Sequence, residues 1–138
     1  MITKKWKNGP SMRDKRSQHG CFYDQQTNSV VVLGGSNGMK GTGTESGLKS
    51  SEQWNLGSKK WISLADFPTS IISSEAVESK SGEYLGFAAG GQTSKETSNK
   101  VWGLRRKDMT WWKMPQRLQR ARQYHSIVNV PSDEIPGC

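Results

Sequence analysis

The hydrophobic residues of this sequence fall into short runs that are separated by polar or glycine-rich segments. The run 30–33 is continuous and rich in valine, which is typical of a strand with both faces covered. A second run covers 84–89, and polar stretches with turn-forming residues precede both runs at 24–28 and 79–83. No segment shows convincing helical periodicity. The pattern therefore predicts a protein built from short strands.

The same pattern predicts eight strands in two groups of four. The first group covers 19–23, 30–33, 51–56 and 61–64, and the second covers 75–78, 84–89, 100–104 and 110–114. The glycine-rich stretch 36–50 is predicted to be a loop. Two further strands are expected at the ends, one around Trp6 and one over 125–130.

Two glycine pairs end the two hydrophobic runs. Gly34 and Gly35 follow the first run, and Gly90 and Gly91 follow the second, 56 residues later. Glycine is expected at such a place where φ is positive or where another chain segment comes too close for a Cβ. The pairs indicate one backbone feature that occurs twice.

A second repeated signal has the form W-x9-R-x2-H and occurs twice with identical spacing. One copy starts at Trp6 and the other at Trp112, whereas the equivalent segment after Trp61 lacks the arginine and the histidine. Trp6, Trp61 and Trp112 are 55 and 51 residues apart. Self-similarity at a fixed period near 50 residues indicates a repeat architecture.

This combination resembles the kelch repeat, in which a glycine pair is followed by an aromatic residue and then by a tryptophan. The matching residues are Gly34-Gly35 with Trp54 and Trp61, and Gly90-Gly91 with Trp102 and Trp112. The resemblance covers roughly residues 6–130. Trp54 and Trp102 occupy a place where the family more often has tyrosine, and Glu52 fits the pattern whereas its counterpart Lys100 does not.

The expected fold is all-β: a kelch-type β-propeller fragment with two four-stranded antiparallel blades plus partial blades at both ends. Residues 1–18 would hold the last strand of a preceding partial blade and an inter-blade loop, 19–67 the first blade and 68–118 the second. Residues 119–138 would hold the first strand of a following partial blade and a C-terminal tail. Propellers need about 4–8 blades, so a fragment, a decayed copy and self-association that completes a propeller all stay open.

Composition narrows the protein class. Leu, Ile, Val and Phe supply 23 of 138 residues at a net charge of +8, which by itself suggests disorder. Six tryptophans argue for an ordered domain with a thin core, because aromatic rings bury much apolar surface per residue. No hydrophobic run is long enough to span a bilayer and no signal peptide is visible, which favours an intracellular location. Cys21 and Cys138 offer no zinc-type pair, and whether they form a disulfide stays open.

The candidate binding surface consists of the loops between second and third strands together with the inter-blade loops; both ends are basic, and this one is distinguished by its arginines and its longer loops. In an up-and-down blade these connections share one end of the molecule, and arginine there can pair with carboxylates or phosphates through two hydrogen bonds. Kelch domains generally act as protein-interaction platforms, so the resemblance implies docking of a protein or an acidic or phosphorylated peptide. The predicted contact residues are Arg13, Arg16, Lys40, Arg117, Arg120 and Arg122. Arg16 and Arg122 hold matching repeat positions, and a structural role for both stays open.

Two other function classes stay open. Some kelch-like propellers are copper oxidases or sugar epimerases, and His19 and His125 would be the imidazoles for a copper site. Yet no pair of aspartates stands at catalytic spacing, so we expect no enzyme activity, no metal and no cofactor. The basic charge also permits non-specific nucleic-acid binding, although no recognition helix or RNA-binding motif is present.

Overall fold

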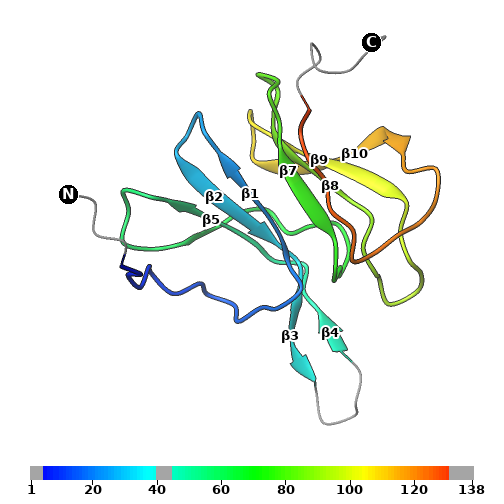
Figure 1. Cartoon of the computed structure of the whole chain (residues 1–138), viewed down its shortest axis with the longest axis horizontal. Coiled ribbons are helices and arrows are strands. Elements are labelled where there is room, and N and C mark those ends of the chain that lie inside the picture. The colour runs from blue at the N-terminus through cyan, green and yellow to red at the C-terminus, as the bar shows by residue number, and fades with distance from the viewer. Residues whose placement is uncertain (1–4, 40–44, 131–138) are drawn as a thin grey trace.

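A computed structural model describes residues 5–39 and 45–130 of the chain. These residues form ten β-strands and no helix, so this part of the chain offers no helix that could cross a membrane. Eight of the strands make two four-stranded antiparallel sheets and the other two make a hairpin (Figure 1). The all-β class expected from the hydrophobic pattern is confirmed.

Sheet 1 is a simple meander in the order β1-β2-β5-β6. Its strands are β1 (Gly20–Asp24), β2 (Ser29–Leu33), β5 (Ser51–Asn55) and β6 (Ile62–Ser63). The predicted loop over 36–50 is wrong in part, because β3 (Ser36–Met39) and β4 (Glu45–Gly47) pair within it. Glycine and serine dominate that stretch, so it has no hydrophobic alternation from which strands could be predicted.

Sheet 2 repeats the meander in the order β10-β9-β8-β7. Its strands are β7 (Glu75–Glu78), β8 (Tyr84–Ala89), β9 (Lys100–Arg105) and β10 (Thr110–Arg117). Sheet 1 lies within the predicted range 19–67, and sheet 2 lies within the predicted range 68–118. Register shifts interrupt the pairing of β8 with β9 and of β9 with β10.

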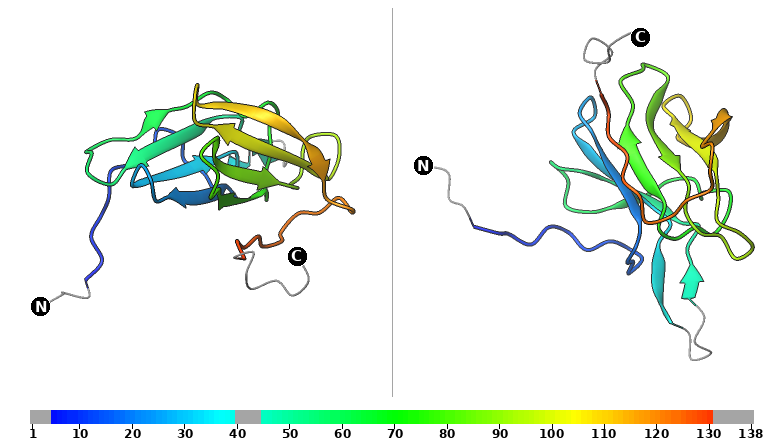
Figure 2. Two further views of the ribbon diagram at one scale, coloured as in Figure 1. Left: turned by 90° about the horizontal axis from the view of Figure 1, so that it is seen from above. Right: turned by 45° about the vertical axis from the view of Figure 1, so that its right-hand side comes forward.

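The strands predicted at the two ends are not formed. Within the described residues, 5–16 and 118–130 contain no strand, and Trp6 is fully exposed. Residues 5–8 extend away from the sheets in both views of Figure 2. A strand needs a hydrogen-bonding neighbour, and the described residues provide none for either segment.

The core lies between the two sheets, which pack face to face. Sheet 1 contributes Phe22, Val31 and Leu33, and sheet 2 contributes Leu85, Leu104 and Trp111 with two alanines. Fully buried Phe67, from the connection between the sheets, fills the space beside Trp111. The indole Nε1 of Trp111 donates to Ser51 Oγ of sheet 1 at 3.1 Å. The core is thin, and its largest rings come from phenylalanine and tryptophan, as the composition suggests.

A buried ion pair joins the two sheets at the end opposite the β3–β4 hairpin. Asp24 is fully buried, and the Arg106 guanidinium donates to Asp24 Oδ1 at 2.8 Å. Burial alone would raise the pKa of Asp24, but hydrogen bonds from Arg106 and Thr27 outweigh it and hold the pKa below its usual range. The carboxylate therefore stays charged and holds the turn between β1 and β2 against the turn between β9 and β10.

The two glycine pairs have the same conformation and the same kind of neighbours. Gly34 and Gly35 have φ of 60° and 89°, and Gly90 and Gly91 have φ of 66° and 96°. A Cβ on Gly34 would lie 2.5 Å from Ile71 O, and one on Gly90 would lie 2.5 Å from Arg122 O. Both reasons expected for glycine, positive φ and close approach of another segment, are confirmed.

Three junction segments, residues 16–19, 71–74 and 122–125, surround these glycines. The first glycine of each pair contacts the junction segment that follows its sheet, and the second contacts the one that precedes it. Gln18, Ser73 and Tyr124 occupy the same place in the three segments, with φ of 52°, 54° and 52°. Ser73 N donates to Gln18 O, and Tyr124 N donates to Ser73 O. The repeat seen in the sequence is therefore also a repeat of backbone structure.

Replacing Gly34 with alanine should lower the free energy of unfolding by about 2–3 kcal/mol. The left-handed conformation costs an L-residue roughly 1–2 kcal/mol, and the new methyl group overlaps the carbonyl of Ile71. Urea denaturation measures the change. Gly82→Ala is the control, because nothing lies within 4 Å of its Cβ position. Equal stabilities of the two variants would contradict the argument.

Candidate functional site

Arg16, one of the predicted contact residues, is a structural residue. Its side chain is completely buried, and its guanidinium lies 2.6 Å from Glu52 Oε1. The same group donates to Gly34 O at 2.6 Å and to Ser50 O at 3.1 Å. Arg16 therefore does not reach the surface to meet a partner. The structural alternative left open for this residue is the one that the geometry supports.

The partner of Arg16 is held from several sides. Glu52 is 1% exposed and also accepts backbone hydrogen bonds from Arg13 N at 2.8 Å and Asp14 N at 3.2 Å. Further along the same segment, Pro10 O accepts a hydrogen bond from Trp61 Nε1 at 2.9 Å. The N-terminal segment is thus fixed to the face of sheet 1 that points away from sheet 2.

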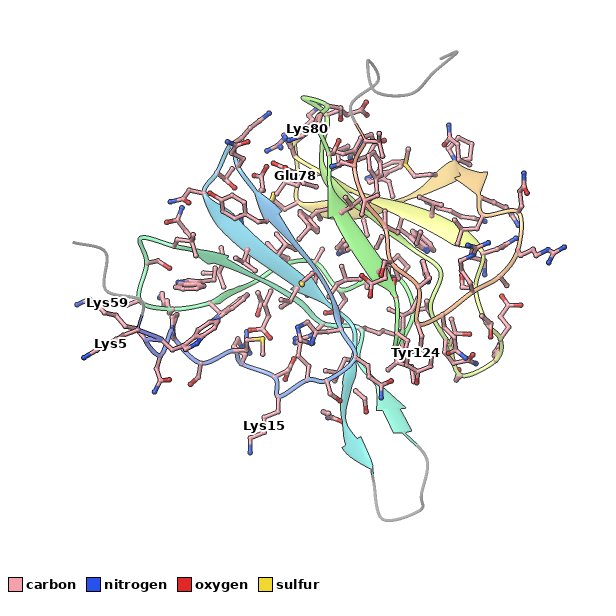
Figure 3. The ribbon with its side chains drawn as sticks, in the orientation of Figure 1. Lys5, Lys15, Lys59, Glu78, Lys80 and Tyr124 are labelled. Carbon is pink, nitrogen blue, oxygen red and sulfur yellow. The ribbon has the colours of Figure 1, made fainter. Side chains whose placement is uncertain are left out.

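The loops with the remaining predicted residues share one end of the molecule, as the meander order requires. Figure 3 shows Lys15 and Tyr124 toward this end, and Lys80 and Glu78 toward the other. We call the first the loop end; it consists of the β2–β5 and β8–β9 connections and the segments before β1, before β7 and after β10. Lys40, which was also predicted to bind, lies outside the described residues.

Three arginines lie close together in the sequence at the loop end. Arg117 is the last residue of β10, and Arg120 and Arg122 follow it; all three are exposed. Three backbone hydrogen bonds fix this stretch to the neighbouring β8–β9 connection: Leu118 N to Asn99 O, Arg122 N to Ser98 O, and Gly91 N to Arg122 O. The exposed guanidinium groups are therefore carried by a backbone that is held in place.

These three arginines have no acidic partner among the described residues, whereas three other arginines do. Arg16 pairs with Glu52, Arg105 with Asp108, and Arg106 with Asp24. Arg13 is exposed and its guanidinium donates to Ser63 Oγ, again without a carboxylate. Four of the six predicted contact residues, Arg13, Arg117, Arg120 and Arg122, thus have exposed side chains available to a partner.

A hollow of about 370 Å³ lies at the β8–β9 connection. Its wall includes Lys95, Glu96 and Lys100, and Trp102 also lines it. Lys100 is the register partner of Arg117 across β9 and β10, so the hollow is adjacent to Arg117. Lys100 pairs with Glu96 at 3.2 Å. The predicted contact set omits Lys95 and Lys100. The structural counterpart of Glu52 is Trp102 rather than Lys100, because Trp102 pairs with Ala88 as Glu52 pairs with Val32.

The two histidines lie against the glycine pairs rather than against each other. A Cβ on Gly35 would touch His19, and a Cβ on Gly90 would touch the ring of His125. Burial lowers the pKa of His19, and nearby Arg16 lowers it further. Burial also lowers the pKa of His125, with Glu75 opposing and Arg122 reinforcing this effect. Among the described residues, no group of three or more His, Cys, Asp or Glu side chains could hold a metal ion.

Comparison of the sequence with models of known protein families and with curated proteins gives no match.

Proposed function

We propose that this protein is a protein-interaction module that docks an acidic or phosphorylated peptide on its loop end. One observation carries the proposal: Arg117, Arg120 and Arg122 are exposed without an acidic partner among the described residues, whereas Arg16, Arg105 and Arg106 are each neutralised by a carboxylate. A basic group that the fold does not use for its own stability is available to a partner.

The geometry suits an extended peptide. Arg117 and Arg120 would pair with carboxylates or phosphates, since the planar guanidinium can donate two parallel hydrogen bonds to either group. The hollow next to Arg117 would take a neighbouring side chain of the peptide against Trp102, with Lys95 and Lys100 adding positive charge. Because the backbone of this stretch is already fixed to the sheet, binding would order little more than side chains. Arg13 and Lys40 remain predicted contributors.

We also propose that the chain has a kelch-type β-propeller architecture, with sheets 1 and 2 as consecutive blades. The support is the equivalence of the two meanders, of the two glycine pairs and of the three junction segments. Such blades present their connections as a platform, and loops on a rigid scaffold are common binding sites. Within the described residues, no observation favours the copper-oxidase, epimerase or nucleic-acid alternatives over this one.

The double variant Arg117→Ala/Arg120→Ala should weaken binding of a fluorescent peptide that contains phosphoserine and aspartate by about 5- to 30-fold. Each exposed ion pair contributes about 0.2–1 kcal/mol, and more when two hydrogen bonds form. Fluorescence anisotropy measures the change, and rising salt should weaken binding by the wild type.

Lys59→Ala/Lys60→Ala is the matched control, because it removes the same charge from exposed residues of the β5–β6 turn at the opposite end. Arg117→Lys/Arg120→Lys separates charge from guanidinium geometry and should bind with intermediate affinity. If Lys59→Ala/Lys60→Ala weakens binding as much as Arg117→Ala/Arg120→Ala does, the binding is general charge attraction and the proposed site is wrong.

A further inference from the structure

Residues 122–129 correspond to residues 71–78, the segment that leads into sheet 2, but the described residues contain no sheet that follows them. The equivalent segment 71–78 does two things: Ile71 O accepts a hydrogen bond from Gly35 N of the preceding sheet, and residues 75–78 form β7 of the next sheet. In the later segment, Arg122 O accepts from Gly91 N at 2.8 Å, and Asn129 donates its side-chain amide to Glu78 O. The segment runs beside β7 (Figure 1), yet residues 118–130 form no strand.

The side chains of the junction segments are matched to the sheets that follow them. Arg16 precedes sheet 1 and pairs with Glu52 of its third strand, β5. At the structurally equivalent positions, sheet 2 has the hydrophobic Ile71 before it and Trp102 in its third strand, because Trp102 pairs with Ala88 as Glu52 pairs with Val32. The sheet that follows a junction arginine therefore has a buried glutamate in its third strand, and the sheet that follows a junction isoleucine has no glutamate there. Arg122 is matched to a sheet of the first kind.

Sheet 1 is a sheet of that kind, and each copy of the chain contains one. We propose that residues 122–129 of one copy bind sheet 1 of a second copy in place of that copy's residues 16–23, with Arg122 entering the buried site of Glu52. The identical R-x2-H spacing then places His125 where His19 lies, against Gly35. One segment of sheet 1 is thus replaced by the equivalent segment of an identical chain.

The residues that follow Arg122 fit this register. Ile127 takes the place of Cys21, and Val128, which is 75% exposed, takes the place of buried Phe22. Asp24 stays on Arg106 and marks the point where the displaced segment leaves the sheet. Residues 16–23 of the second copy give up their place in sheet 1, and Arg122 restores to Glu52 the cationic partner that Arg16 had supplied.

The second copy is favoured over other partners because both halves of the contact are present in this chain. The arginine-bearing segment and the glutamate-bearing sheet belong to one sequence and have the same spacing as an existing intramolecular contact. Two copies would bring four sheets together, which reaches the lower end of the range of about 4–8 blades in closed propellers. The two proposals share Arg122, but Arg117 and Arg120 lie outside the segment 122–129, so the peptide-binding test on those two arginines can fail or succeed separately from the association test.

Molecular mass in solution tests the proposal, measured by light scattering on the full chain across a wide range of concentrations. We expect the wild type to form dimers or larger species as concentration rises, and Arg122→Glu to remain a single chain. The fold of this variant should be intact by near-UV circular dichroism, since Arg122 is exposed. The control Lys107→Glu, an equal charge reversal at an exposed turn, should associate as the wild type does.

Cross-linking tests the register. Cys21 pairs with Val32 across β1 and β2, so Ile127→Cys and Val32→Cys should form a disulfide between two copies in a Cys21→Ser/Cys138→Ser background. Val128→Cys with Val32→Cys is the control, because successive residues of a strand point to opposite faces. A single-chain mass at all concentrations, association that Arg122→Glu leaves unchanged, or equal cross-linking from positions 127 and 128 would each overturn the proposal.

Discussion

Replacement of Arg16 by alanine should lower the free energy of unfolding by about 3–5 kcal/mol, because it leaves the carboxylate of Glu52 buried without its cationic partner. Both side chains are almost completely removed from water, so the remaining charge cannot recover hydration without opening the structure. Since typical domains are stable by only about 5–15 kcal/mol, this one change could remove much of the stability. Urea denaturation followed by tryptophan fluorescence measures it.

Two further variants test whether Arg16→Ala loses stability because Glu52 is left charged and unpaired, rather than because a large side chain is removed. The double variant Arg16→Met/Glu52→Gln removes both charges and should be more stable than Arg16→Ala, because no buried charge is left alone. Arg13→Ala, at an exposed arginine without a carboxylate partner, should change stability by less than about 1 kcal/mol. If Arg16→Ala is no worse than Arg13→Ala, the buried pair does not stabilise the fold.

Replacement of Phe67 by alanine should destabilise the chain by about 3–5 kcal/mol, the range for removing a large side chain from a packed core. Phe67 is fully buried, and its ring lies 5.5 Å from that of Trp102 and 5.0 Å from that of Trp111, measured between ring centroids. Loss of these contacts should also weaken the near-UV circular dichroism of the two indoles. Denaturation and circular dichroism together measure the effect.

Phe87→Ala provides the comparison for Phe67. Phe87 is half-buried and contacts Tyr84 on the face of sheet 2 that points away from sheet 1, so its removal should cost less. It should also leave the signal of Trp111 unchanged. A larger loss at Phe87 than at Phe67 would mean that the contact between the sheets is not the main source of stability.

Local sequence patterns predicted the eight strands of the two sheets because each is a short hydrophobic run bounded by turn residues. Val30 to Leu33 and Tyr84 to Ala89 are the clearest cases, and the observed strands Ser29–Leu33 and Tyr84–Ala89 follow them closely. The hairpin of β3 and β4 could not be found in this way, because it contains hardly any hydrophobic residue. The predicted strand over 125–130 failed for a different reason: a hydrophobic segment becomes a strand only where another strand can pair with it.

The candidate site was predictable only in part, because the partners of the arginines are distant in sequence. Arg16 and Glu52 are 36 residues apart, and Arg106 and Asp24 are 82 apart. Nothing local distinguishes these paired arginines from the exposed Arg117 and Arg120. The recurrence of Arg16 and Arg122 at one repeat position was a signal of packing at Arg16, whereas the exposed arginine pair has no counterpart in the repeat.

The glycine pairs have a consequence for how the protein loses its structure. Each pair is enclosed by the junction segments before and after its sheet, and residues 71–74 serve both pairs. Opening either sheet would therefore release a segment on which the other depends. The two sheets are expected to melt in one cooperative transition, with no populated intermediate that keeps a single intact sheet.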